Sequence, residues 1–118
     1  MPFRFQSFPI YPSIREYIRG CYQISANFPK SELLGLTSQL RRAATSILLN
    51  LAEGSAKKSD LEFNRFILMS IGSISETVAI LDIVLDQSYI TQSTYQEFLQ
   101  KAEALARQLY GFSKKLKP

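Results

Sequence analysis

The sequence predicts an all-α protein, an antiparallel up-down-up-down four-helix bundle that forms one domain over residues 1–118. Apolar residues recur at spacings of three and four in four separate segments, which is the period of an amphipathic helix. No segment shows the strict alternation of a β-strand, and the connectors are short, so consecutive helices must run antiparallel. The 118 residues are 46% hydrophobic and 20% charged, which suits a single globular core.

The first helix is expected over residues 12–27. Pro12 suits the first turn of a helix, where a missing N–H costs nothing, and Pro29 ends the segment because the residue before proline avoids the α region. The first ten residues are expected to form an extended lead-in that packs on the bundle. The apolar stripe consists of Ile14, Tyr17, Cys21, Ile24 and Phe28.

The second helix is expected over residues 31–52, with Ser31 as the N-cap. Gly54 stands where a left-handed C-cap is expected, since glycine adopts positive φ without steric cost. The stripe of apolar residues consists of Leu36, Leu40, Ala43, Ile47 and Leu51.

The third and fourth helices are expected over residues 59–87 and 91–116. Ser59 and Glu62 match the spacing of a capping box, in which each residue satisfies a backbone N–H of the other. The third stripe consists of Phe63, Ile67, Ile71, Ile74, Val78, Leu81 and Leu85. The fourth consists of Tyr95, Phe98, Ala102, Leu105, Leu109, Phe112 and Leu116.

The residues that most enzymes need are scarce in this chain. The absence of histidine removes the histidine-dependent catalytic triads and the commonest transition-metal ligand. Cys21 falls on a core stripe, so it is interpreted as a small buried hydrophobe. Asp82 and Asp86 lie one helical turn apart, but a solvated acidic face explains them better than a metal site. We therefore expect no enzymatic activity, no cofactor and no metal.

The expected location is the cytoplasm. No secretory h-region stands at the N-terminus, and the lone cysteine fits a reducing compartment. The longest nearly apolar run, Val78–Leu85, is far shorter than the roughly 20 residues of a membrane span, so no membrane partner is expected.

Charge is distributed unevenly along the chain. Residues 59–100 are acidic, whereas the segments before and after them are basic, and the net charge is +4. In an up-down bundle the N-terminus, the second connector and the C-terminus meet at one pole, which then attracts phosphates. The same lysines also complement a helix dipole and keep a protein soluble. The candidate nucleic-acid contacts at this basic pole are Arg4, Lys57, Lys58, Lys114, Lys115 and Lys117.

The third helix carries a second apolar stripe opposite its core face. A helix that is apolar nearly all round is normally buried nearly all round, so this stripe predicts a subunit interface. The alternative is that the first and fourth helices wrap unusually far around the third. The predicted interface residues are Leu68, Gly72, Ala79 and Ile83, with Met69 and Ile80 alongside.

The motif LTSQLRRAATSI over residues 36–47, followed by NLAEG over residues 50–54, resembles a known signature. It is similar to that of the bacterial four-helix bundle family called 23S rRNA intervening-sequence proteins, and the similarity extends over residues 3–116. One departure is Leu48, where the family commonly has a proline that would kink the helix.

The resemblance implies a cytoplasmic homo-oligomeric ring, with a pentamer favoured, and it implies no catalytic residues. The accessory variability determinant of diversity-generating retroelements looks like a relative, which implies RNA, DNA or a reverse transcriptase as partners. Arg41 and Arg42 of the motif are further candidate nucleic-acid contacts, although pairing with acids such as Glu76 is as good an explanation. Two hypotheses therefore remain: a nucleic-acid-associated adaptor, and a structural or protein-interaction ring without nucleic acid.

Overall fold

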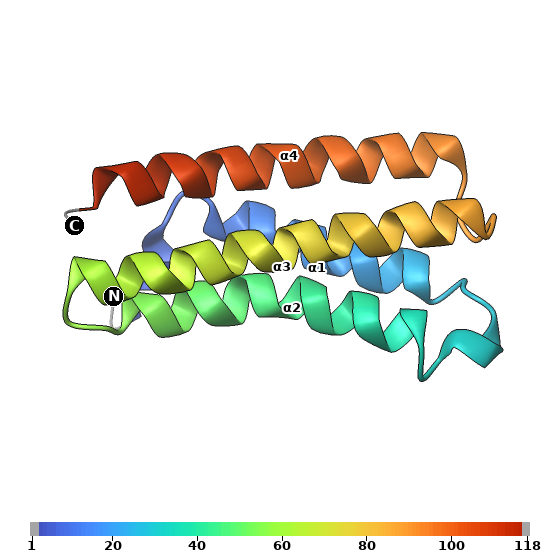
Figure 1. Cartoon of the computed structure of the whole chain (residues 1–118), viewed down its shortest axis with the longest axis horizontal. Helices are drawn as coiled ribbons and strands as arrows, with labels where there is room; N and C mark the ends of the chain where they lie inside the picture. Colours follow the sequence, from blue (N-terminus) through green and yellow to red (C-terminus); the bar gives the residue numbers. More distant parts are fainter. Residues whose placement is uncertain (1–2, 117–118) are drawn as a thin grey trace.

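Four helices run antiparallel along a common axis, in the up-down-up-down order expected (Figure 1). They are α1 (Tyr11–Ser25), α2 (Leu36–Ser55), α3 (Asp60–Asp86) and α4 (Gln92–Lys115). The computed structural model describes residues 3–116, and this part of the chain contains no strand. Two 3₁₀ turns, η1 (Arg4–Ser7) and η2 (Lys30–Glu32), precede α1 and α2. The four-helix architecture is therefore confirmed.

The four helices pack around one core, but their contacts are unequal. The α2–α3 interface is the most extensive, the α3–α4 and α1–α2 interfaces follow, and α1 and α4 touch least. Two buried hydrogen bonds hold the centre together: Ser70 donates to the carbonyl of Ile47 at 2.8 Å, and Tyr17 and Thr77 share a hydrogen bond of 2.8 Å. Because Thr77 also donates to the carbonyl of Ile74, the Tyr17 hydroxyl is the donor of the shared bond.

The start of α2 differs from the prediction. The helix begins at Leu36, and Ser31 lies in the η2 turn, so Ser31 is not the N-cap. Gly35 occupies the N-cap position with a non-helical backbone and has no side chain to satisfy the first N–H groups. Glu32 supplies the missing acceptor, because its Oε1 accepts a hydrogen bond from the N–H of Leu36 at 3.3 Å.

The expected role of Gly54 is also wrong. It is a buried helical residue one position before the end of α2, and among residues 3–116 no glycine has a positive φ. A Cβ at Gly54 would lie 2.5 Å from Cβ of Phe66 and 3.0 Å from Cδ1 of Phe63. Glycine is required here because α3 passes too close for any side chain.

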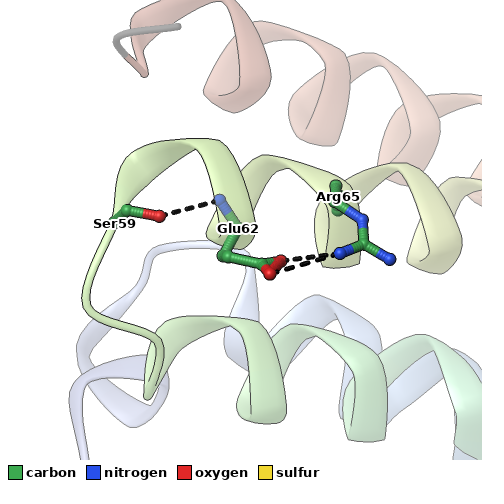
Figure 2. Close-up of polar contacts among 3 residues, drawn as sticks. All are labelled: Ser59, Glu62 and Arg65. Atoms are coloured by element: carbon green, nitrogen blue, oxygen red, sulfur yellow. Dashed lines mark hydrogen bonds and ion pairs between the residues drawn. The ribbon is translucent and has the colours of Figure 1, made fainter.

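The N-terminus of α3 has half of the expected capping box. Ser59 Oγ accepts a hydrogen bond from the N–H of Glu62 at 3.1 Å (Figure 2). The Glu62 carboxylate forms an ion pair of 2.9 Å with Arg65 instead of reaching back to the backbone of Ser59. The cap is therefore one-sided, and Glu62 is partly neutralised.

The C-terminus of α3 is closed by a left-handed residue, Ser88, with φ 62°. The N–H of Tyr89 reaches the carbonyl of Val84 and that of Ser88 the carbonyl of Leu85, which is the Schellman arrangement. The hydroxyl of Tyr89 then donates to Glu32 at 3.1 Å, so this turn is tied to η2.

The residues before α1 pack on the bundle as expected, although they form the η1 turn rather than an extended lead-in. Phe8 lies 6.0 Å from Phe63 and 5.0 Å from Phe112, measured between ring centroids, and Ile10 is buried. This cluster joins the N-terminal segment to α3 and α4.

By length and composition alone, α3 is apolar enough to cross a membrane. This is weak evidence for a span, because the core helix of a soluble bundle has the same composition. Here one side of α3 is packed against α2 and α4, and what needs explaining is its apolar outer side.

Candidate nucleic-acid interface

The end of α2, the start of α3 and the end of α4 meet at one pole of the bundle, together with η1 (Figure 1). The fold thereby brings together the predicted basic residues, and all those in the described chain are exposed: Arg4, Lys57, Lys58, Lys114 and Lys115. The sixth, Lys117, lies outside the described residues.

Arg4 differs from the lysines because its guanidinium already has partners. Nη1 donates to the carbonyl of Ser55 at 3.2 Å, near the end of α2. Its Cζ lies 5.3 Å from the centroid of the Phe63 ring and 6.0 Å from that of Phe8, within cation–π range. Arg4 therefore fastens η1 to α2 and α3 while contributing its charge to the pole.

The lysines are less constrained. Lys57 Nζ lies 5.3 Å from the centroid of the Phe66 ring, a cation–π contact at the surface. Within residues 3–116, Lys58, Lys114 and Lys115 have no hydrogen bond or ion pair. These three ammonium groups come from two separate segments, the α2–α3 connector and the last turn of α4, and they are available to bind anions.

Arg41 and Arg42 lie elsewhere, roughly 20 Å from the basic pole along α2. Nε of Arg41 donates to Ser25 Oγ at 2.9 Å, Nη2 donates to the carbonyl of Tyr22 at 3.3 Å, and the guanidinium lies over the Tyr22 ring. Arg41 therefore joins α2 to the end of α1. Arg42 is exposed and lines a groove between α2 and α3 that also contains Glu76.

The second apolar stripe of α3 is exposed, as the interface prediction requires. Leu68 is 48% exposed and Ile83 46%, and a Cβ at Gly72 would meet no atom within 4 Å. Ala79 is also exposed. The alternative, in which α1 and α4 cover this side, is wrong. We call Leu68, Gly72, Ala79 and Ile83 the outer stripe of α3.

Two details of that stripe differ from the prediction. Ile80 does not border it, because its side chain is buried in the core at 3% exposure, whereas Met69 is 49% exposed. Leu61, which is 60% exposed, lies seven residues before Leu68 and extends the stripe toward the basic pole. Counting one heptad back from Leu68 along the sequence would have identified Leu61 as a member of the stripe.

Of the two paired carboxylates, Asp82 has a structural partner. Asp82 accepts a hydrogen bond of 2.6 Å from the hydroxyl of Tyr95, which joins α3 to α4. No group of three or more potential metal ligands occurs in the part of the chain that the structure describes. The amide of Asn50 donates to the carbonyl of Ser46 at 2.9 Å, within the same helix.

Cys21 is fully buried on α1, which confirms its place in the core. Burial raises the pKa of its thiol from 9.0 to about 12, against a smaller opposite effect of the neighbouring Tyr17 hydroxyl. Burial also raises the pKa of Tyr17. Neither group is ionised near neutral pH, so Cys21 has the character of a core side chain and not of a nucleophile.

We expect the free energy of unfolding to fall as the pH rises above about 9. The unfolded thiol loses its proton near pH 9.0, whereas the folded thiol keeps it until about pH 12, so ionisation favours the unfolded chain in this window. The slope from Cys21 approaches about 1.4 kcal/mol per pH unit. Urea denaturation at pH 8.0 and 10.5 under reducing conditions measures it. The Cys21→Ala variant should show a shallower slope, and an equal slope would contradict the assignment.

A family model described as 23S rRNA-intervening sequence protein matches residues 6–111. The chain belongs to this family. The match covers all of α1, α2 and α3 and most of α4, so it spans the bundle rather than a local motif. The comparison with curated proteins gave no match.

The family-like signature on α2 is explained largely by packing in this member. Leu40, Ala43, Ile47 and Leu51 are buried in the core. Arg41 fastens α1, and Gly54 permits the close approach of α3. Leu48 packs partly buried against the core, and α2 continues without interruption from Leu36 to Ser55.

Proposed function

We propose that this member of the 23S rRNA-intervening sequence protein family is a non-catalytic, homo-oligomeric adaptor that binds nucleic acid through the basic pole. The observation that supports the proposal most directly is the convergence of Lys58, Lys114 and Lys115, which have no partner within residues 3–116. Such ammonium groups neutralise backbone phosphates and release counterions without reading sequence. RNA, DNA and a retroelement reverse transcriptase are the partners to test.

Fewer acidic than basic side chains lie at this pole. Glu62 forms an ion pair with Arg65, which offsets its charge at the start of α3. Glu53 and Asp60 are the other two acids of the pole. A ring of subunits would repeat the basic pole around one rim, and repeated weak sites bind a polymer more tightly than one site does.

Binding of single-stranded RNA and duplex DNA is expected to weaken steeply with salt. On duplex DNA the log–log slope should be about −0.9 for each phosphate neutralised. The Lys58→Glu, Lys114→Glu double variant should lose at least tenfold in affinity for all sequences alike, because both charges reverse at the pole. Fluorescence anisotropy across a salt series measures both effects.

The matched control is Arg19→Glu, Lys30→Glu, which changes the net charge equally at exposed positions outside the basic pole. Equal loss in both double variants would mean that only net charge matters and would contradict a localised site. Unchanged binding in Lys58→Glu, Lys114→Glu would move the contact elsewhere, with Arg42 the next candidate. Absence of binding at low salt, with the oligomer intact, would favour a ring without nucleic acid.

The proposed oligomer uses the outer stripe of α3. The stripe combines exposed aliphatic side chains with Gly72, where even an added methyl group would have no atom within 4 Å, so a partner helix could approach closely. Contiguous exposed apolar residues of this kind are typical of protein interfaces. This same observation favours the second candidate function, a structural or protein-interaction ring.

Gly72→Glu is expected to dissociate the oligomer, because it places a charge in the middle of the outer stripe. Sedimentation velocity at micromolar concentration measures the particle mass. Gly111→Glu is the control, because Gly111 is an equally open helical glycine on α4 and should leave the mass unchanged. A monomeric wild type would refute the oligomer, and an unaltered mass for Gly72→Glu would place the interface elsewhere.

A further inference from the structure

A largely apolar groove lies between the N-terminal segment and the last turns of α4. Phe8, Pro9 and Ile10 form one wall, and the other is formed by Gln108, Gly111, Phe112 and Lys115. Its volume is about 430 Å³, within the range of roughly 300–1,000 Å³ that small-molecule sites occupy. Neither the outer stripe of α3 nor the groove that Arg42 lines shares a residue with it.

The sequence of α4 explains why a groove exists here. Residues 108, 111, 112 and 115 lie on one side of the helix, at the i, i+3, i+4, i+7 spacing. Gly111 leaves a gap in the middle of that side, since a Cβ there would meet no atom within 4 Å. The groove is therefore an unfilled position between side chains and not a defect in the core.

The walls of the groove are held in place by contacts with each other and with the core. Phe8 packs edge-on against Phe112 and stacks on Phe63, with ring centroids 5.0 and 6.0 Å apart. Ile10 is 4% exposed. A site with such fixed walls is formed before a ligand arrives, which reduces the entropy lost on binding.

Two polar groups stand at the ends of this apolar lining. Gln108 and Lys115 are seven residues apart on α4, which corresponds to roughly 10 Å. The Lys115 ammonium forms no hydrogen bond or ion pair within residues 3–116. An apolar slot with one cation at its end complements a molecule that has an apolar body and one negative charge.

We propose that this groove binds a small amphiphilic anion, with a hydrocarbon or aromatic body about 10 Å long and a single carboxylate or sulfonate paired with Lys115. The apolar body would lie over Gly111, against the outer sides of the Phe8 and Phe112 rings. Lys115 also belongs to the basic pole, but the groove requires neither bound nucleic acid nor a second subunit.

The test uses 1-anilinonaphthalene-8-sulfonate as the fluorescent probe and decanoate as its competitor, with the full chain. Wild type should bind the dye saturably, and decanoate should displace it. Gly111→Leu fills the gap and should lower the dye affinity at least tenfold. Lys115→Gln should lower it several-fold, whereas Lys114→Gln, which removes the same charge outside the groove, should leave it within twofold.

Several results would overturn the proposal. Dye binding that persists in Gly111→Leu, or that falls equally in Lys114→Gln and Lys115→Gln, would exclude the groove. Binding lost in Leu68→Gln but kept in Gly111→Leu would place the dye on the outer stripe of α3. Circular dichroism of Gly111→Leu checks its folding. Decanoate-induced NMR shifts in wild type should also centre on residues 8–10 and 108–115, and shifts elsewhere would contradict the site.

Discussion

Replacing Phe63 by alanine is expected to lower the free energy of unfolding by about 3–5 kcal/mol, the usual cost of removing a buried phenylalanine. The side chain is 1% exposed near the start of α3. It lies against the rings of Phe8 and Phe112 and under the guanidinium of Arg4. The substitution therefore leaves a cavity and loosens the N-terminal segment together with the end of α4. Urea denaturation followed by circular dichroism measures the loss.

Tyr110→Ala is the control, because Tyr110 is a large aromatic residue of α4 that is 52% exposed. This substitution should lower the free energy of unfolding by well under about 1 kcal/mol, as is usual at the surface. A second readout is proteolysis: the segment before α1 should be cut faster in Phe63→Ala than in Tyr110→Ala. Equal stabilities for the two variants would show that the aromatic cluster does not hold this end of the bundle.

Substituting Gly54 by alanine is expected to destabilise the protein by about 2 kcal/mol, although alanine is the better helix former by about 1 kcal/mol. The added methyl would lie 2.5 Å from Cβ of Phe66 and 3.3 Å from the carbonyl oxygen of Phe63, so α2 and α3 would have to separate. Overpacking of this kind costs about 3 kcal/mol when the backbone must move.

Gly111→Ala is expected to change the free energy of unfolding in the opposite direction. Its methyl would enter open space, so only the helix propensity changes, and stability should rise by about 1 kcal/mol. Thermal and urea denaturation of both variants test the pair. A stabilised Gly54→Ala would mean that the helices are farther apart than the structure places them.

Helical periodicity was sufficient to predict the fold because apolar residues recur at spacings of three and four in every helix. The starts of α3 and α4 were predicted to within one residue, since Ser59 and Thr91 each accept a hydrogen bond from a backbone N–H three residues on. The start of α2 was not predicted correctly, because the N–H of its first residue, Leu36, is satisfied by Glu32 from the separate η2 turn. Such a cap has no fixed spacing for a sequence pattern to reveal.

In the candidate sites, too, features set by the order of the helices could be predicted from the sequence, whereas contacts between distant segments could not. The convergence of Lys58 and Lys114 followed from helix order alone. The partners of the two arginines could not be predicted in this way. The partner of Arg41 lies on α1, 16 positions away in sequence, and that of Arg4 lies on α2, 51 positions away. Gly54 resembled a C-cap since its position fits one, and only the distance to Phe66 shows that it spaces two helices.

The unequal interfaces between the helices imply an order in which the bundle assembles. The α2–α3 interface is the most extensive and joins neighbours separated by four residues, so its contacts close only a short loop. The α1–α4 interface is the smallest and joins the first and last helices of the chain. Its formation therefore closes the longest loop, at the highest entropic cost, and gains the fewest contacts. The α2–α3 hairpin is therefore the natural nucleus, and the pairing of α1 with α4 is the last step of folding and the first to open.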